Sequence, residues 1–223
     1  MKRAVLMLSF AAAVGCAGAR GARPERPETA AAGRAALRAA AYECESGKYI
    51  VADFMGRQDE VWLFLPGGTL RLKRARSASG ARYVGEGAEF WSKGRTATVR
   101  ADDGVADRCR EDPLSSRLES VKLSGKDFWA SGNEPGWTLE IGHGSILLVT
   151  DYGATRMEFP LLKPREDRER LMTVYLTGDG ENSLEVTLRA GPCRDSMSGR
   201  RFGAAVALAL NGERLTGCGQ ALH

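Results

Sequence analysis

From Tyr42 onward the chain is a succession of short segments rich in β-branched and aromatic residues, each followed by a turn signal. Such segments at intervals of about ten residues are typical of antiparallel barrels and sandwiches. The first group of expected strands covers 49–54, 61–65, 69–74, 82–85, 89–92 and 95–100. The second group covers 137–141, 146–150, 156–162, 173–177, 184–189, 204–210 and 214–218. We therefore expect an all-β chain with two successive β-rich blocks.

Turn residues support this division into strands. Pro66-Gly67-Gly68 and Asp102-Asp103-Gly104 each combine residues that favour tight turns. Asn211-Gly212, between two expected strands, is the strongest hairpin signal in the chain. The charged run 163–170 is polar throughout, which predicts a solvated loop.

Composition excludes several classes of function. The 223 residues are 43% hydrophobic and 27% charged, an ordinary balance for one or two globular domains. Only two histidines are present, His143 and His223, so a His-dependent triad or a multi-histidine metal site is not expected. The net charge of +4 comes from basic residues interspersed with acidic ones, which does not indicate nucleic-acid binding. We expect no metal and no cofactor.

The N-terminus has the features of an export signal. Positive residues precede a short apolar stretch, which is too short for a transmembrane helix. It ends in Ala13-Val14-Gly15-Cys16, which resembles the bacterial lipobox. The resemblance implies that residues 1–15 are a signal peptide, that Cys16 is acylated, and that Ala17 directs the lipoprotein to the outer membrane, facing the periplasm. The alternative is an ordinary signal peptide cut elsewhere.

Two segments lack the large apolar residues that a core needs. Residues 16–41 are dominated by Ala, Arg, Gly and Pro, which predicts a flexible tether with a possible short helix over 30–41. Residues 111–126 contain Asp112-Pro113 and several Ser, which predicts a linker with a possible strand over 118–123. The expected domains are therefore 42–110 and 127–223.

Cysteine usage agrees with an oxidising compartment. If Cys16 of the five cysteines carries lipid, four remain, and four cysteines allow three pairings. With two domains, the local pairing is Cys44–Cys109 and Cys193–Cys218. Each bridge would stabilise its domain by about 3–4.5 kcal/mol.

Residues 42–110 carry a specific combination of motifs. These are Tyr42-Glu43-Cys44, SASGARY at 77–83, FWSKG at 90–94, Ala97-Thr98-Val99 and Cys109. The combination resembles the membrane-bound inhibitors of C-type lysozyme. The resemblance implies a small antiparallel β-barrel, attachment in the bacterial envelope, and a C-type lysozyme as the partner.

The same resemblance implies which residues bind. Ser79 and Lys93 match the family's two loop residues that enter the lysozyme cleft, with Gly80 allowing close backbone approach. We expect Tyr83 and Trp91 to give these loops aromatic support, with use of one of them at the interface as the alternative, and for Trp91 we favour a core position over a contact with the partner. The alternative is that the serines only form a turn and that Lys93 is an ordinary solvated side chain.

The second block contains GNEPGW at 132–137 and CRDSMSG at 193–199. These signatures resemble an uncharacterised domain of bacterial envelope lipoproteins. This resemblance implies no activity for the second block. Asn133, Glu134 and Asp195 form a possible polar site, unless they only hydrogen-bond backbone in turns. GxSxG and SxxK are both absent, which disfavours an enzyme.

The sequence therefore predicts a lipid-anchored inhibitor of C-type lysozyme that is not an enzyme. The alternative hypothesis is an envelope binding module for a small ligand or a cell-wall polymer. No residue decides the oligomeric state.

Overall fold

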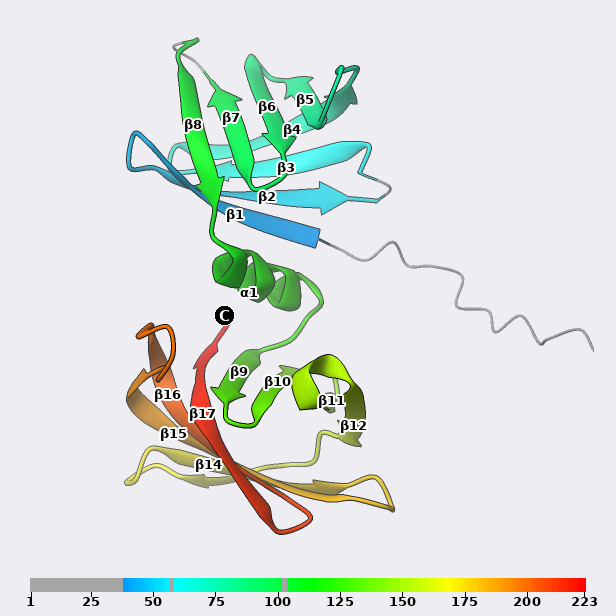
Figure 1. The fold of residues 1–223 in the computed structure, drawn as a ribbon, viewed down its shortest axis with the longest axis vertical. Coiled ribbons are helices and arrows are strands. Elements are labelled where there is room, and N and C mark those ends of the chain that lie inside the picture. The colour runs from blue at the N-terminus through cyan, green and yellow to red at the C-terminus, as the bar shows by residue number, and fades with distance from the viewer. Residues whose placement is uncertain (1–37, 57, 102–103) are drawn as a thin grey trace, which may run out of the picture. The chain divides into compact units, whose positions relative to one another are not determined.

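The computed structural model describes residues 38–56, 58–101 and 104–223, and its first eight strands close into an antiparallel barrel (Figure 1). These strands are β1 (Arg38–Cys44), β2 (Tyr49–Met55), β3 (Glu60–Leu65), β4 (Gly68–Ala75), β5 (Ala81–Gly85), β6 (Ala88–Lys93), β7 (Thr96–Arg100) and β8 (Ala106–Glu111). Each strand pairs with the next, and β1 pairs with β8, so the ring is complete. The expected all-β class and barrel are confirmed.

Side chains fill the barrel. Inward positions alternate with outward ones along each strand, and aromatic residues occupy the centre. The rings of Tyr42, Phe54, Tyr83 and Phe90 pack with centroids 5.8–6.4 Å apart. Because these rings occupy the interior, the barrel is a packed frame for its loops.

The other strands form one nine-stranded antiparallel sheet. They are β9 (Phe128–Asn133), β10 (Gly136–Gly142), β11 (Ser145–Thr150), β12 (Thr155–Pro160), β13 (Arg165–Asp167), β14 (Met172–Gly178), β15 (Ser183–Arg194), β16 (Arg201–Leu210) and β17 (Glu213–Ala221). The order across the sheet is β12-β11-β10-β9-β17-β16-β15-β14-β13. Apolar residues such as Leu139, Ile146, Leu148 and Phe159 build its core. This second sheet confirms the expected second β-rich block.

The hairpin expected at Asn211-Gly212 joins β16 to β17. Both residues have positive φ angles, 51° and 87°, as a two-residue hairpin turn of this kind requires. The expected loop at 163–170 is only partly correct, because β13 lies within it and pairs with β14.

Helix α1 (Pro113–Leu123) corrects the possible strand over 118–123 that we expected within the linker 111–126. Asp112 caps the helix by accepting hydrogen bonds from the backbone N–H groups of Leu114 and Ser115. The buried helix residues are Ser116 and Val121, so apolar periodicity is weak and the sequence pattern does not stand out. In the part of the chain that the structure describes, no helix is long and apolar enough to cross a membrane.

Strand β1 corrects the end of the expected tether. Residues 38–41, assigned to the segment 16–41, are the first part of a strand that pairs with β2. Small alanines suit this position because α1 packs over them, with the Ser116 and Ser120 hydroxyls accepting backbone hydrogen bonds from β1. The expected signal peptide, Cys16 and the remaining tether lie outside the described residues.

Candidate functional site

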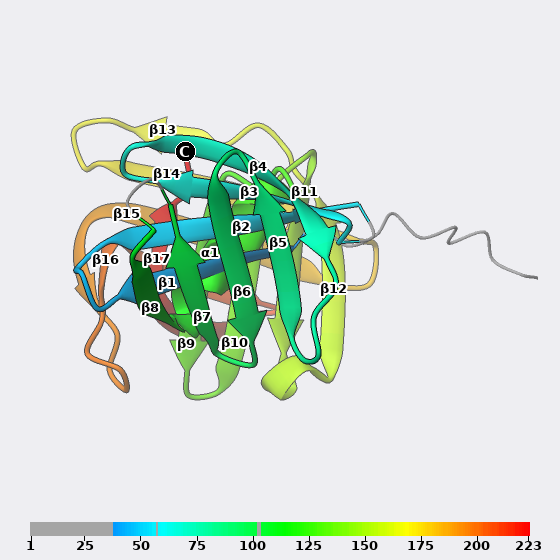
Figure 2. The ribbon, with the colours of Figure 1, turned by 90° about the horizontal axis from the view of Figure 1, so that it is seen from above.

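The barrel places two short loops next to each other. Residues 76–80 join β4 to β5, and Gly94-Arg95 join β6 to β7. Strands β5 and β6 are antiparallel neighbours, with Ala81 opposite Ser92, and Figure 2 shows them side by side. Ser79 on the first loop and Lys93 at the second are both exposed. The structure therefore brings together the two residues that the sequence singled out.

Gly80 allows this close approach. Its φ angle is +71°, which favours glycine, and a Cβ atom there would lie 2.3 Å from the Ser92 carbonyl oxygen. The same Cβ would lie 3.2 Å from the Cβ of Lys93. A side chain at this position would push the first loop away from β6, so glycine sets the separation of the two loops.

Trp91 connects the Ser79 loop to β6, the strand that ends at Lys93. Its indole Nε1 donates a hydrogen bond of 2.8 Å to the backbone carbonyl oxygen of Ser79. The expectation that Trp91 lies in the core is wrong, because its side chain is 40% exposed. The strand alternation contained the signal: Phe90 points inward, so Trp91 must point outward.

Lys93 stands at a shallow hollow of about 480 Å³. The Thr96 hydroxyl donates a hydrogen bond of 3.0 Å to the Lys93 carbonyl, which fixes the backbone of this hairpin. Among the described residues, the Lys93 ammonium forms no ion pair. The hollow is lined by three cations (Lys93, Arg108, Arg110) and two acids (Glu43, Glu45), together with Trp91, Thr96, Ala97, Thr98 and Cys109. Sequence reasoning missed Arg108 and Arg110 as surface neighbours of Lys93.

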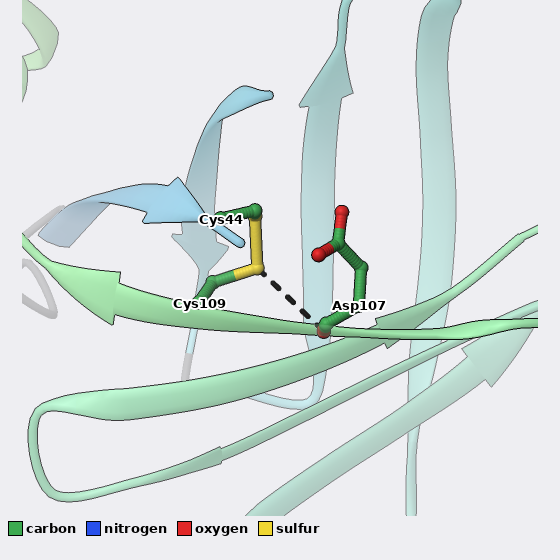
Figure 3. A group of neighbouring side chains, drawn as sticks. All are labelled: Cys44, Asp107 and Cys109. Atoms are coloured by element: carbon green, nitrogen blue, oxygen red, sulfur yellow. Dashed lines mark hydrogen bonds between the residues drawn. A yellow bond between two sulfur atoms is a disulfide. The ribbon is translucent and has the colours of Figure 1, made fainter. Parts of the chain in front are cut away.

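The bridge Cys44–Cys109 links the two strands that close the barrel, as Figure 3 shows beside Asp107. Because both sulfur atoms are bonded to each other, neither is a thiolate that could bind a metal. The Asp107 carboxylate accepts a hydrogen bond of 3.2 Å from the Ser46 backbone N–H. The disulfide and this hydrogen bond therefore stabilise the barrel near the hollow that Lys93 lines.

Tyr83 is a core residue of the strand that follows the Ser79 loop. It is fully buried, and its hydroxyl donates a hydrogen bond of 3.1 Å to the Gln58 carbonyl. Burial raises the pKa of this phenol, and the Arg74 guanidinium lies 5.8 Å from the ring centroid. Tyr83 thus supports the loop and offers no surface to a partner.

In the second sheet, the structure brings Asn133 and Asp195 together. The Asn133 amide donates hydrogen bonds of 2.7 Å to Asp195 and 3.0 Å to the Ser196 hydroxyl. The Ser198 hydroxyl and backbone N–H hydrogen-bond the Asp195 carboxylate, which lowers its pKa. Glu134 is exposed and makes no hydrogen bond or ion pair within the described residues. These contacts hold a turn, next to the disulfide Cys193–Cys218.

Comparison with known proteins bears on the barrel. The family model described as membrane-bound lysozyme inhibitor of C-type lysozyme matches residues 42–108. A protein of Yersinia enterocolitica with the same description is 44% identical over 87 residues, which cover 39% of this chain and 71% of the relative. One from Pseudomonas aeruginosa is 32% identical over 84 residues, covering 33% of this chain and 65% of the relative. No solved structure gives a significant match.

Proposed function

The chain belongs to the family of membrane-bound lysozyme inhibitors of C-type lysozyme, and from this membership we propose that it inhibits such lysozymes with Ser79 and Lys93. The family is one of inhibitors and not of enzymes. The residues that match the family model include both loops, whereas the second sheet lies outside them.

The proposed mechanism rests on the chemistry of the lysozyme cleft. That cleft contains two carboxyl groups, one kept protonated as the general acid and the other ionised. A lysine ammonium is a compact charge with three hydrogen-bond donors, and near two carboxyl groups it favours their ionised forms. A general acid that is held as a carboxylate cannot protonate the leaving group. Lys93 therefore occupies the lysozyme cleft and also prevents proton transfer from the general acid to the leaving group.

The adjacency of the two loops is the observation that supports this proposal. Ser79 and Lys93 are exposed, Trp91 hydrogen-bonds the Ser79 loop to the strand that ends at Lys93, and Gly80 lets this loop approach that strand. Because Lys93 forms no ion pair within the described residues, it binds a partner's carboxylate without first breaking a salt bridge. Loops held by a closed, disulfide-braced barrel lose little conformational entropy on binding.

We also propose that the mature chain is anchored by lipid on Cys16 in the outer membrane, facing the periplasm. The lipobox-like sequence before Cys16 supports this anchor. Mass spectrometry of the chain purified from membranes should show Cys16 as the first residue, carrying acyl chains. A first residue other than Cys16, or an unmodified Cys16, would refute the lipid anchor.

The inhibition is tested by the clearing of a bacterial cell suspension by a C-type lysozyme. The purified mature chain should slow clearing in a dose-dependent way. The double variant Ser79→Ala/Lys93→Ala should need at least about tenfold more protein for the same effect, because it loses a charge-assisted contact. Lys163→Ala, an exposed lysine near the second sheet, is the matched control and should inhibit like the parent. Full lysozyme activity at micromolar excess of the oxidised parent would refute the proposed function.

A further inference from the structure

A hollow of about 650 Å³ is lined mainly by residues of the second sheet, together with Arg117 of α1. Part of its lining is a row of neighbouring residues across four strands: Ser131 is opposite Thr138, Thr138 is opposite Val149, and Val149 is opposite Arg156. Two hydroxyl groups, an apolar side chain and a guanidinium group therefore lie in this order across the hollow. Of the barrel residues that the structure describes, none lines this hollow.

Tyr152 forms an aromatic wall of the hollow. It lies in the 3-10 turn Asp151–Gly153 with a φ of 54°, and its side chain is 88% exposed. A Cβ atom on Gly136 would lie 2.9 Å from the ring, so the ring rests directly against this glycine. An exposed aromatic ring held over a backbone surface is available for stacking.

Positive charge dominates the hollow. Arg117 of α1 forms an ion pair of 2.7 Å with the buried Glu140. Arg156 has no acidic partner within the described residues, and no acidic residue lines the hollow. One guanidinium therefore remains without a counter-charge. Guanidinium groups bind carboxylates with two parallel hydrogen bonds.

We propose that this hollow binds a hexose that carries one carboxylate. Arg156 pairs with the carboxylate, the Ser131 and Thr138 hydroxyls bind ring hydroxyls, and Tyr152 stacks on the apolar face of the sugar. Small-molecule sites commonly combine an aromatic surface with a few convergent polar groups in this way. This site is independent of the proposed inhibition, because none of its residues lies on the barrel.

Isothermal titration calorimetry of the full mature chain tests this assignment. The probes are N-acetylmuramic acid, glucuronic acid and the neutral N-acetylglucosamine. The two acids separate a cell-wall source of the carboxylate from a uronic-acid source, and binding of either one supports the site. The neutral sugar should bind at least about tenfold more weakly than the better acid.

Two variants locate the binding. Arg156→Gln should weaken binding of the acid at least about tenfold and reduce the preference for the acid over the neutral sugar, because it removes the guanidinium that has no acidic partner among the described residues of the hollow. Tyr152→Ala should weaken binding of the acid and binding of the neutral sugar by similar factors. The matched control Arg165→Gln, an exposed arginine of β13, should bind like the parent.

Three results would overturn the assignment: no heat from either acid at millimolar concentration, equal binding of the neutral sugar, or unchanged acid binding by Arg156→Gln. Lysozyme inhibition measured on the same samples should not change. The two proposals therefore fail separately.

Discussion

The indole Nε1 of Trp91 donates a hydrogen bond of 2.8 Å to the carbonyl oxygen of Ser79, so that a strand residue holds the loop of its neighbouring strand. This bond connects the two residues that carry the proposed inhibition, because Lys93 lies two positions beyond Trp91 on the same outward face of β6. The geometry of the serine loop therefore depends on an indole that neither loop contains.

Trp91→Phe tests that dependence. Phenylalanine keeps an aromatic ring and loses the donor, so the Ser79 loop gains freedom at a cost of about 0.5–1.5 kcal/mol. We expect inhibition to weaken by about 2- to 10-fold with little change in melting temperature. Trp62→Phe is the control, since Trp62 is 41% exposed on β3 and its indole makes no hydrogen bond in the described part of the chain. Equal effects of the two substitutions would contradict the positioning role.

Gly80→Ala should both destabilise the barrel and weaken inhibition. Its φ is +71° and its new Cβ would collide with the Ser92 carbonyl. Gly87→Ala is a matched control, because Gly87 has a φ of +75° and nothing within 4 Å of its Cβ position. Backbone strain alone costs about 1–2 kcal/mol. The free energy of unfolding should therefore fall by this amount in the Gly87 control and by more in the Gly80 variant. Chemical denaturation of both variants measures the difference, and equal losses would show that the contact with β6 is unimportant.

Asp53 should make the protein less stable as pH rises from about 4 to 6. Burial, aided by the nearby Glu119 carboxylate, raises the pKa of Asp53 from 3.8 to about 6, while Lys122 acts in the opposite direction. The folded protein then binds the proton more tightly than the unfolded chain, so stability is present at low pH and is lost as pH rises. At about 1.4 kcal/mol per pKa unit, the loss from this group is about 2–3 kcal/mol.

Asp53→Asn should therefore be more stable than the parent at pH 7 and show less change between pH 4 and 6. One oxygen of Asp53 is buried without a hydrogen-bond partner among the described residues, which makes its charge costly. Asp59→Asn, an exposed site, is the control and should keep the parent's pH dependence. Urea titrations at several pH values supply the measurement, and a parallel shift of both variants would argue against Asp53 as the source.

Removal of the two disulfides should have unequal effects. In the chain-entropy account, a longer closed loop gives more stabilisation. The bridge Cys44–Cys109 spans a separation of 65 residues and Cys193–Cys218 one of 25. Replacing the first pair by alanine should therefore cost about 0.8 kcal/mol more than replacing the second. Urea denaturation of the two double variants checks the order, and the reverse order would mean that local packing outweighs loop length.

Strand alternation and turn chemistry predicted much of the fold. The turn at Asn211-Gly212 requires positive φ angles, which few other residue pairs adopt. The hairpin could therefore be predicted from the sequence alone. The adjacency of Ser79 and Lys93 depends on the register of the β5–β6 pair, in which Ala81 lies opposite Ser92. The strand pattern alone did not give this register.

Helix α1 shows why other parts were missed. Its signals were the cap Asp112 and the proline after it, whereas its buried face contains Ser116. A serine that hydrogen-bonds the Ala41 backbone N–H contributes to packing without any apolar pattern. Strand β1 begins with an alanine-rich stretch, and alanine is not enriched in strands. Tertiary contacts, and not local propensity, determine both elements.

The pairing of β1 with β8 has a consequence for how inhibitors of this kind diversify. Because the described strands of the barrel form a closed ring, the barrel has no edge strand with which an extended chain could pair. Recognition is then left to side chains at the loop tips. New targets are accessible through substitutions at the loop tips, while the strands that hold these loops keep the same pairing.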